Sequence, residues 1–572
     1  MKYALARNLT PVENETLKMY PEFLRGLLVE RGLKTPEEAE KFFTPNFEAD
    51  SHDPFLLKDM DRAVARILLA IEKNQKTIIF SDYDADGIPG GVILHDFFRR
   101  LGYLNFENYI PHRHLEGFGL NHEALEDFVT EKADLVITVD CGITDLEEIE
   151  RGQKAGLDFI ITDHHLPGEK LPEAIVLDPK RTDCDYPEKM LCGAGVAFKL
   201  VQAILLKKDF GLKPGWEKWL LDLVGIATLS DMVPLLGENR VLAYYGLKVL
   251  RKSPRLGLRS LLSILNIDQS KLTEDDIGFS LSPRINAASR LGVPKDAFDL
   301  LAATDEVEAK TLARHLNEIN DERKGLVASL VKEVRKIIKK RTDDGETKKK
   351  VLVIGNPDWR PSLLGLVANS LLDDHEGAIF LWGREGGDCL KGSCRSDGSV
   401  HLLELMKQLP AGIFLDYGGH ALSGGFSLNQ EKVHKLEEEL LVAHDKICTT
   451  DAVLLPTVLS ARLTLEEVDL KTYSQLEKLA PFGVGNPKPL FLLEKVKIKE
   501  VKVFGKEKNH LEIVVMDDKK NVSITAFFTR PDFAGFELVK GEKFSFIVNL
   551  EKNNFRGKSE IRLRLVDIFV DF

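Results

Sequence analysis

The chain has 572 residues, a formal net charge of −12, 44% apolar residues and 29% charged residues. This composition is ordinary for a globular protein, and the length suggests three to four domains at about 150 residues each. No run approaches the roughly 18 uncharged apolar residues of a membrane helix, and the start lacks the apolar core of a secretory signal. The six cysteines form no CxxC pair. We therefore expect no membrane partner and a reducing, cytoplasmic location.

The predicted elements change character along the chain. Residues 1–75 carry apolar side chains at helical spacing and predict helices. Short runs rich in Ile and Val at 76–80, 134–139 and 158–162 then alternate with helical segments, which predicts βαβ units and a parallel sheet. Residues 305–341 give the longest helical pattern, weakened only by Gly325, and a polar, turn-prone linker follows.

The second half of the chain predicts two further folding units. A second α/β unit begins with VLVIG at 351–355 and EGAIFLWG at 376–383. After about residue 450, five short alternating strands at close intervals predict a small antiparallel barrel. The expected fold class is therefore α/β, with a parallel-sheet domain, a long helix, a second α/β domain and a C-terminal barrel.

Acidic residues follow the predicted strands of the first sheet. Asp82, Asp84 and Asp86 come after the first strand, Asp140 after the second and Asp163-His164-His165 after the third, while Asp231 follows the apolar segment LVGIATLS. An EF-hand calcium loop is excluded, because Ile93 stands where that loop needs a Glu and no helix precedes it. Any single Asp is more commonly a helix cap or a surface group. Ligands of open α/β sheets bind beyond the carboxyl ends of the strands, so the repeated placement predicts one shared site.

The residue types indicate a chemistry for that site. Carboxylates with one imidazole and no thiolate favour Mn²⁺ or Mg²⁺ over structural zinc. Several aspartates could hold two such ions about 4 Å apart, which would activate a water and stabilise the attacking and leaving oxygens of a phosphoryl transfer. His164 and His165 are consecutive, so we expect one to bind metal while the other faces a substrate oxygen.

The order DYDADG, VDCG, TDHH and LSDMVP resembles the DHH phosphoesterase superfamily, and the flanking motifs resemble the bacterial RecJ group of single-stranded-DNA exonucleases. These motifs are IPHRHLEGFGL at 110–120, LCGAGVAFKL at 191–200, LSDMVPLLGENR at 229–240, PRINAASRLG at 283–292, KGSCRS at 391–396, GGHALSGGF at 418–426 and PFGVGNPKPLF at 481–491. The resemblance covers nearly the whole chain in the family order. It implies a helical segment at 1–75, a DHH catalytic domain at 76–304, a connecting helix and linker at 305–349, a DHHA1 domain at 350–449 and an OB-fold at 450–572.

The resemblance also implies roles for particular residues. The two-metal ligand set matches Asp84, Asp86, Asp140, His164 and Asp231. Asp82 and His165 match catalytic positions beside the ions, with His165 placed to contact the scissile phosphate. The substrate phosphate-binding positions match Arg113, Arg284, Ser393, Arg395, Gly419 and His420. The barrel sequence itself offers basic and aromatic residues for a strand-binding groove, namely Lys499, Lys502, Lys506, Lys508, Arg556, Phe504, Phe527 and Phe555. Most of these phenylalanines are expected in the barrel core, so the prediction is the groove and not individual stacking residues.

The implied activity is that of a metal-dependent exonuclease that degrades single-stranded DNA in the 5′-to-3′ direction to 5′-mononucleotides, in DNA repair and recombination. Its implied cofactors are two divalent cations, Mn²⁺ in preference to Mg²⁺. Its implied partner is single-stranded DNA, with a helicase and a single-strand-binding protein as candidate protein partners.

Two alternative functions stay open. One is a DHH phosphodiesterase acting on short oligoribonucleotides or cyclic dinucleotides, which would need no extended strand-binding barrel. The other is a non-catalytic single-strand-binding scaffold, against which the intact ligand positions argue. The chain also departs from the family at Ile88-Pro89-Gly90, where many relatives carry Thr-Ser, and at Arg360 and Ser362, where His and Gly are common.

Overall fold

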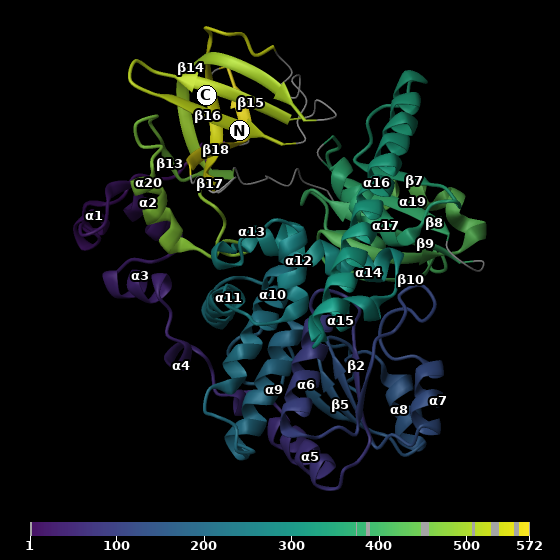
Figure 1. The fold of residues 1–572 in the computed structure, drawn as a ribbon. Helices are drawn as coiled ribbons and strands as arrows, with labels where there is room; N and C mark the ends of the chain where they lie inside the picture. The colour runs from purple at the N-terminus through teal and green to yellow at the C-terminus, as the bar shows by residue number, and fades with distance from the viewer. Residues whose placement is uncertain are drawn as a thin grey trace. The chain divides into compact units, whose positions relative to one another are not determined.

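The computed structural model describes residues 3–372, 374–384, 389–447, 457–505, 510–527, 537–553 and 560–570. The chain forms two compact units (Figure 1). One comprises residues 54–231 and 248–454, and the other comprises the N-terminal residues to 53, residues 232–247 and the C-terminal region from residue 455. Among the described helices, none is long and apolar enough to cross a membrane.

A five-stranded parallel sheet forms the core of the first unit, in the order β3-β2-β4-β5-β6. Its strands are β2 (Thr77–Ser81), β3 (Phe106–Tyr109), β4 (Leu135–Val139), β5 (Asp158–Thr162) and β6 (Ile175–Leu177). Every residue of β2 and β4 is buried, because helices cover both faces of the sheet. The predicted parallel sheet is therefore confirmed.

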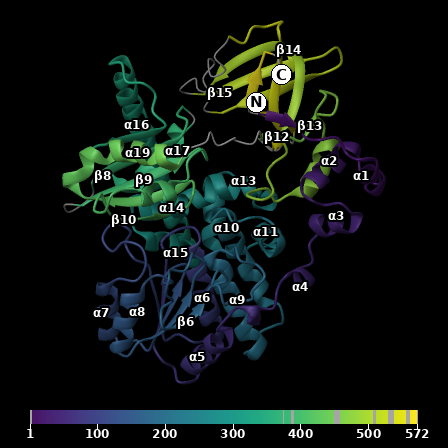
Figure 2. The ribbon, with the colours of Figure 1, turned by 180° about the vertical axis from the view of Figure 1, so that it is seen from behind.

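Helices lie on both faces of this sheet. Helices α7 (His122–Thr130) and α8 (Leu146–Lys154) lie on one face, and α6 (Gly87–Leu101) and α9 (Gly193–Lys207) lie on the other (Figures 1 and 2). Phe80, Phe128, Val136 and Ile161 belong to the apolar core on the α7 side. This layering leaves the carboxyl ends of the strands as the open edge of the sheet.

Helical segments surround and extend this domain. They are η1 (Pro54–Leu56), α5 (Met60–Glu72), η2 (Trp216–Leu220), α10 (Leu221–Ser230), α12 (Leu256–Ile264), η3 (Gln269–Lys271), α13 (Glu274–Asp276), η4 (Ile277–Leu281), α14 (Ser282–Leu291) and α15 (Pro294–Ala302). Most of α11 (Gly237–Leu250) belongs to the other unit. The 38-residue helix α16 (Glu306–Asp343) follows, and the Asp305 side chain caps it by accepting hydrogen bonds from the backbone N–H groups of Val307 and Glu308. The predicted long helix is confirmed, and Gly325 does not interrupt it.

A second, mixed sheet follows α16 in the order β10-β11-β9-β8-β7. Its strands are β7 (Val351–Gly355), β8 (Ala378–Arg384), β9 (Leu390–Ser396), β10 (Phe414–Gly419) and β11 (Ser423–Leu428), and only β7 and β8 pair in parallel. Helix α17 (Pro361–Leu371) and the second half of α16 share one apolar core with this sheet. The other core includes α18 (Leu402–Lys407) and α19 (Leu436–Ile447), and η5 (Gln430–Lys435) precedes α19.

The second unit contains the C-terminal barrel. Its strands are β13 (Ala461–Arg462), β14 (Phe491–Phe504), β15 (His510–Met516), β16 (Asn521–Ala526), β17 (Lys543–Asn553) and β18 (Glu560–Phe569), and the pairing of β14 with β17 closes it. The expectation of an antiparallel barrel needs a correction, because β13 pairs with β14 in parallel and β16 pairs with β18 in parallel. Strand alternation fixes which residues face the core but carries no information on which strands pair.

Short helices also belong to this unit, and some of them contribute residues to the barrel core. They are α1 (Pro11–Thr16), α2 (Glu22–Glu30), α3 (Pro36–Phe43), α4 (Phe47–Asp50), α20 (Leu470–Leu476) and η6 (Glu477–Leu479). Leu24, Leu27 and Leu28 of α2 share the barrel core. Tyr3–Leu5 form strand β1, parallel to β12 (Thr457–Leu459), which the helical pattern of the N-terminal segment did not predict.

Candidate active site

The acidic residues predicted to share a site lie at one edge of the parallel sheet. Asp82 follows β2, Asp140 follows β4 and Asp163 follows β5. The backbone pairing continues past the strands, since the N–H of Asp82 donates to the carbonyl of Val139 and the N–H of Asp140 donates to the carbonyl of Thr162. Residues far apart in the sequence are thereby held side by side, as the strand-end argument predicts.

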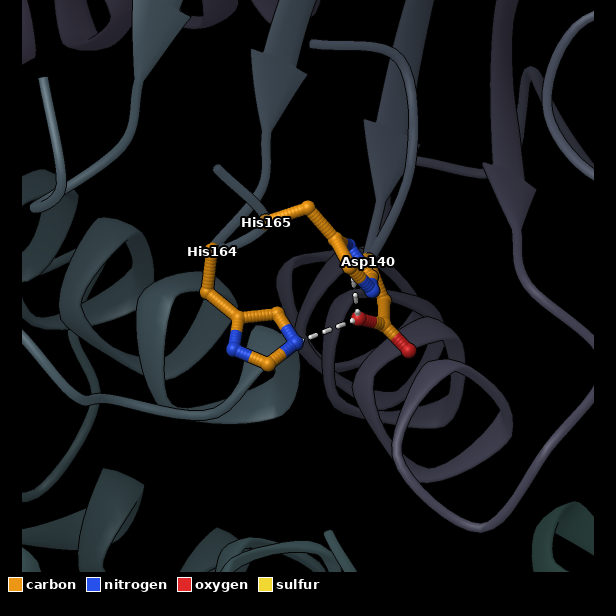
Figure 3. Close-up of side chains that lie close together, drawn as sticks. All are labelled: Asp140, His164 and His165. Atoms are coloured by element: carbon orange, nitrogen blue, oxygen red, sulfur yellow. Dashed lines mark ion pairs between the residues drawn. The ribbon is translucent and has the colours of Figure 1, made fainter. Parts of the chain in front are cut away.

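His164 lies among three carboxylates. Its Nε2 is 3.0 Å from Asp140 Oδ1 and 3.6 Å from Asp86 Oδ2, and its Nδ1 is 3.8 Å from Asp231 Oδ2. Figure 3 shows the imidazoles of His164 and His165 approaching Asp140 from different directions, with ring planes 58° apart. His165 Nδ1 is 3.9 Å from Asp140 Oδ1. Both consecutive histidines therefore reach the same carboxylate.

Three groups of side chains could each hold a cation, with their ligand atoms within 4.8 Å of one another. The groups are Asp82 with Asp84 and Asp140, Asp86 with His164 and Asp231, and Asp140 with His164 and His165. Asp140 and His164 each belong to two groups, so the groups adjoin. Carboxylate oxygens with imidazole nitrogen suit Mn²⁺ or Mg²⁺. The structure thus brings together all five predicted metal ligands with Asp82 and His165.

Burial and mutual repulsion perturb these groups. Burial, reinforced by neighbouring carboxylates, raises the pKa of Asp86 to about 7 and that of Asp231 to about 8. The same causes raise the pKa of Asp140 and Asp82 well above the ordinary range. Burial and the nearby His165 lower the pKa of His164 to about 3. Divalent cations are the partners that would stabilise such a set of buried carboxylates in their charged form.

Asp163 positions the two histidines, a role that sequence reasoning did not give it. Its Oδ1 accepts hydrogen bonds from the backbone N–H groups of His164 and His165 and lies 2.8 Å from His165 Nδ1. Its Oδ2 accepts a hydrogen bond from the backbone N–H of Ile143. Burial lowers the pKa of His165, but the hydrogen bond and charge of Asp163 outweigh it and raise that pKa to about 9. The position of Asp163 in the TDHH motif was a signal for this role.

The N-terminus of α9 lies close to the carboxylates of Asp86 and Asp140. Both oxygens of Asp86 accept hydrogen bonds from the first turn of α9, at 2.6 Å from the N–H of Gly193 and 2.8 Å from that of Ala194. A Cβ on Gly193 would stand 2.5 Å from Asp140 Cβ, so only glycine fits there. The glycine in the LCGAGVAFKL motif therefore allows α9 to reach the site.

An arginine cluster adjoins the carboxylates. Burial lowers the pKa of Arg290 to about 9, and the next causes are the charges of Arg113, Arg323 and Arg395. In the described part of the chain, Arg290 Nε and Arg323 Nε are buried without a hydrogen-bond partner. Clustered guanidinium groups with unused donors form a site for an anion such as a phosphate. Arg113 also stacks over Tyr83, with its Cζ 5.0 Å from the ring centroid.

Arg290 and Arg323 of this cluster are additional to the predicted phosphate-binding residues. Arg284 is held by the protein, since its Nε donates to Asn317 Oδ1 at 3.0 Å and its Nη1 donates to the Ser280 carbonyl at 2.7 Å. Arg290 and Arg323 were not predicted. Arg290 lies in the quoted PRINAASRLG motif, whereas Arg323 is one of many charged residues of α16, and no local pattern distinguishes it.

The second sheet adds the remaining predicted phosphate residues. Ser393 and Arg395 lie on β9, and a Cβ on Gly365 would stand 2.8 Å from Arg395 Nη2, so α17 passes close to this guanidinium. Gly419 has a φ of 137° at the end of β10. The pKa of His420 is lowered by burial and by the charges of Lys180 and His165, which places His420 near the DHH motif.

The two departures from the family pattern have structural consequences. Ile88, Pro89 and Gly90 are buried in the first turn of α6, where a Cβ on Gly90 would stand 2.5 Å from Val139 Cγ1. Ser362 holds Arg290, because its carbonyl accepts from Arg290 Nη1 at 2.8 Å and its hydroxyl donates to the Arg290 carbonyl at 3.1 Å. The departure at residue 362 thus contacts the arginine cluster directly.

The barrel carries a mixed aromatic and cationic surface. Phe504, His510 and Phe527 lie within 6.3 Å of one another between ring centroids. The guanidinium carbons of Arg562 and Arg564 lie 5.3 and 5.8 Å from the Phe527 ring centroid. Lys499 and Lys502 are exposed on β14. The predicted groove residues Lys506, Lys508, Phe555 and Arg556 lie outside the described residues.

Comparisons with known proteins cover most of the chain. Three family models match: the N-terminal domain of the DHH family at residues 76–228, the DHHA1 domain at 348–444 and the RecJ OB domain at 459–567. The chain is 33% identical to the single-stranded-DNA-specific exonuclease RecJ of Bacillus subtilis, over 97% of this chain and 69% of the relative. It is 30% identical to that of Haemophilus influenzae, over 90% of this chain and 91% of the relative.

Solved structures agree with these relatives. The fold matches RecJ from Thermus thermophilus in complex with Mn²⁺, with a TM-score of 0.81 and 26% identity over 99% of this chain and 79% of that chain. The Mg²⁺ complex of the same protein matches with a TM-score of 0.75 and 25% identity over 99% of this chain and 78% of that chain. Together with the gathered DHH motif, the mixed sheet and the closed barrel, these matches place the chain in the RecJ family of DHH–DHHA1 proteins.

Proposed function

We propose that the protein is a metal-dependent exonuclease that degrades single-stranded DNA from the 5′ end to 5′-mononucleotides, in DNA repair and recombination. The observation that carries this proposal is the convergence of Asp84, Asp86, Asp140, His164 and Asp231 at the end of the parallel sheet. The relatives that are named as single-stranded-DNA-specific exonucleases are similar in sequence to this chain over 97% and 90% of its length. We propose the same domain limits as in the sequence analysis: a helical segment at 1–75, the DHH domain at 76–304, the connecting helix and linker at 305–349, the DHHA1 domain at 350–449 and the OB-fold at 450–572.

Divalent cations are the cofactors, and we assign two, with Mn²⁺ preferred over Mg²⁺. Asp86, His164 and Asp231 would hold one ion, Asp82, Asp84 and Asp140 would surround the other, and Asp140 adjoins both groups. When bound, the pair supplies an activated water and charge stabilisation for phosphodiester hydrolysis. Asp86 is oriented for this by the α9 amides, and Asp163 fixes the backbone that carries His164.

His165 is the residue that we place against the scissile phosphate. Its Nδ1 is bonded to Asp163, which leaves Nε2 for a non-bridging phosphate oxygen. The side chain is 38% exposed, whereas that of His164 is 7% exposed, so His165 is the histidine that a substrate can reach. A donor fixed at this place would stabilise the charge that develops on the phosphate.

The arginine cluster would hold the phosphate at the end of the strand, while the 5′ polarity is taken from the resemblance to the family. We assign Arg113, Arg290, Arg323 and Arg395, with Ser393, Gly419 and His420 beside them, to the terminal 5′-phosphate. Arg284 contributes by holding α14 against α16. A phosphate held here while the next phosphodiester lies at the cations restricts cleavage to the nucleotide at the end.

The barrel would bind the strand that leads to the site. Its exposed lysines attract the backbone, and the Phe504, His510 and Phe527 rings offer surfaces for bases. A helicase and a single-strand-binding protein are candidate partners that would supply such strands. The cytoplasm is the proposed location, and the five cysteines that the structure describes are free thiols, as expected there.

An end-labelled digestion series tests the proposal. A single-stranded oligonucleotide labelled at the 5′ or at the 3′ end is incubated with the protein and Mn²⁺, Mg²⁺ or a chelator. We expect the 5′ label to be released at once as a mononucleotide, the 3′-labelled strand to shorten progressively, and no cleavage in chelator. Faster cleavage of dinucleotides than of long strands would instead indicate the short-substrate phosphodiesterase, and binding without cleavage in Mn²⁺ would indicate the scaffold.

A further inference from the structure

A cavity of about 290 Å³ lies in the second-sheet part of the same unit and shares no lining residue with the candidate active site. It is bordered by the last turns of α16, the segment after that helix, the start of β7, the end of α17 and the start of α19. Neither the metal ions nor the terminal phosphate of the proposed reaction uses it. The cavity therefore needs its own explanation.

The lining carries more positive than negative charge. Of its five lysine and arginine residues, Arg335 pairs with Asp374 at 2.6 Å, while Arg341 and Lys349 both pair with Glu437, at 3.2 and 3.3 Å. Lys339 and Lys348 make no ion pair or hydrogen bond with the residues that the structure describes. Two ammonium groups are thus left for an anion from outside.

A buried histidine gives an independent indication of a ligand. His375 lines the cavity and is 7% exposed, yet its Nε2 has no hydrogen-bond partner in the described part of the chain. Burial and the charge of Lys348 lower its pKa, so the imidazole is neutral at physiological pH. A buried polar atom without a partner costs free energy that a bound ligand would recover.

The remaining wall is apolar. Ile338, Leu352 and Leu371 line the cavity, and Leu352 and Leu371 are 7% and 0% exposed. A phosphate ion has no apolar surface that could pack against these side chains, so they would add nothing to its binding free energy. The volume of about 290 Å³ is just below the roughly 300–1,000 Å³ typical of small-molecule sites, which admits one nucleotide but excludes an extended strand.

We infer that this cavity binds a nucleoside monophosphate. Lys339 and Lys348 bind the phosphate, His375 Nε2 hydrogen-bonds a polar atom of the ligand, and the three aliphatic side chains pack against the sugar or base. The choice of a mononucleotide rests on the proposed function, which releases such molecules, whereas the charge and the unpartnered imidazole do not depend on it. The site would let the protein respond to its own product.

Calorimetric titration of the full-length chain with dAMP tests this inference. The parent protein carries Arg395→Ala and the buffer contains a chelator, so that binding at the candidate active site is reduced. We expect Lys339→Glu with Lys348→Glu to weaken dAMP binding by about tenfold or more, because each charge-assisted contact is worth about that factor. Lys332→Glu with Lys336→Glu is the matched control, since both are exposed on α16 and neither lines the cavity.

Inorganic phosphate and deoxyadenosine identify which part of the ligand is recognised. We expect phosphate to bind more weakly than dAMP and deoxyadenosine to bind more weakly still, and we expect His375→Gln to retain more affinity than His375→Leu. Equal dAMP affinity in the lysine variant and its control, phosphate binding as tight as dAMP binding, or no dAMP binding at millimolar concentration would each overturn the inference. None of these titrations requires cleavage. If the protein cleaved no DNA, the proposed function would be rejected, but the titrations would still test whether the cavity binds a nucleoside monophosphate.

Discussion

At the scale of single residues, Asp140 connects the two groups of candidate ligands. It has a positive φ of 64°, lies 3.0 Å from His164 Nε2 through its Oδ1, and is 3% exposed. A non-glycine residue in this backbone region is strained, and such strain is found where surrounding structure holds a functional side chain in place. The backbone therefore holds the Asp140 carboxylate in one place, where it belongs to two neighbouring groups of candidate metal ligands.

Asp140→Asn tests this role without changing the size of the side chain. We expect the cleavage rate to fall by at least about a thousandfold, because the amide is neutral and a weak ligand for a hard cation. Single-stranded DNA binding should stay within a few-fold of the parent, as the arginine cluster and the barrel are unchanged. Asp358→Asn, at an exposed loop position, is the control. Full turnover in the Asp140 variant would contradict the ligand assignment.

Arg395 allows the assignment of the terminal phosphate to be checked separately from metal binding. We expect Arg395→Ala to reduce the rate on 5′-phosphorylated strands by about tenfold or more and to leave 5′-hydroxyl strands little affected. The measured quantity is the ratio of kcat/KM on the two ends. Arg284→Ala should change this ratio less, because two of the five N–H donors of Arg284 already bond Asn317 and Ser280. An equal loss on both ends in the Arg395 variant would reject the assignment.

At the scale of elements, α16 joins the two sheets of one unit. Its first half packs against α12, α14 and α15, and its second half shares an apolar core with α17 and the second sheet. The helix also carries Arg323 to the arginine cluster. Its continuity therefore affects both the stability of the unit and the geometry of the site.

Gly325 has the least favourable helix propensity in α16, so replacing it should stabilise the helix. It is exposed and nothing lies within 4 Å of an added Cβ, so Gly325→Ala should raise the free energy of unfolding by roughly 0.5–1 kcal/mol and leave activity unchanged. Gly102→Ala is the contrasting control, because the same open space comes with a φ of +74° that alanine adopts poorly. Thermal or denaturant unfolding measures both, and a loss of stability in Gly325→Ala would show that the glycine has another role.

A buried ion network fixes three helices of the DHH domain. Arg255, before α12, lies 2.6 Å from Asp96 of α6 and 2.8 Å from Asp222 of α10. Arg255→Ala would leave Asp222, which is 2% exposed, without its cationic partner. We expect a destabilisation of about 3–5 kcal/mol in denaturant unfolding, against less than about 0.5 kcal/mol for the exposed control Arg259→Ala. Equal effects of the two variants would show that the network does not stabilise the domain.

At the scale of the whole molecule, the raised carboxyl pKa values link stability to pH and to metal. The pKa values of Asp86 and Asp231, about 7 and 8 in the folded chain, exceed the ordinary carboxyl value of 3.8. The folded state therefore binds more protons than the unfolded state between these values, and its stability falls as the pH rises from about 4 to 8.

This linkage predicts a stability profile that depends on cations. In chelator, we expect the Tm to fall by at least about 5 °C between pH 5 and pH 8, and saturating Mn²⁺ should remove most of this loss at pH 8. Asp140→Asn should reduce the stabilisation by Mn²⁺. A Tm in chelator that is constant or rises over this range would contradict the repulsion between the buried carboxylates.

The sequence by itself determined the strands, the long helix, the order of the domains and the residue types of the site. Ile- and Val-rich runs, a helical apolar stripe and acidic residues at strand ends are local patterns, and each is readable within a few residues. They were sufficient to predict that Asp140 and His164 meet, because parallel strands end at one edge. Asp231 follows the helix α10 and not a strand, so its place in the site depends on how that helix packs.

Only the tertiary structure decided the features that depend on contacts between distant segments. Arg323 reaches Arg290 because α16 crosses the domain, Ser362 holds Arg290 from another element, and β16 pairs with β18 in parallel. The same reason gives Arg284 its two hydrogen bonds to Asn317 and Ser280, and its predicted contact with a substrate phosphate stays a prediction. Hydrogen-bond partners and strand neighbours are set by how the whole chain packs, and local periodicity carries no record of that packing.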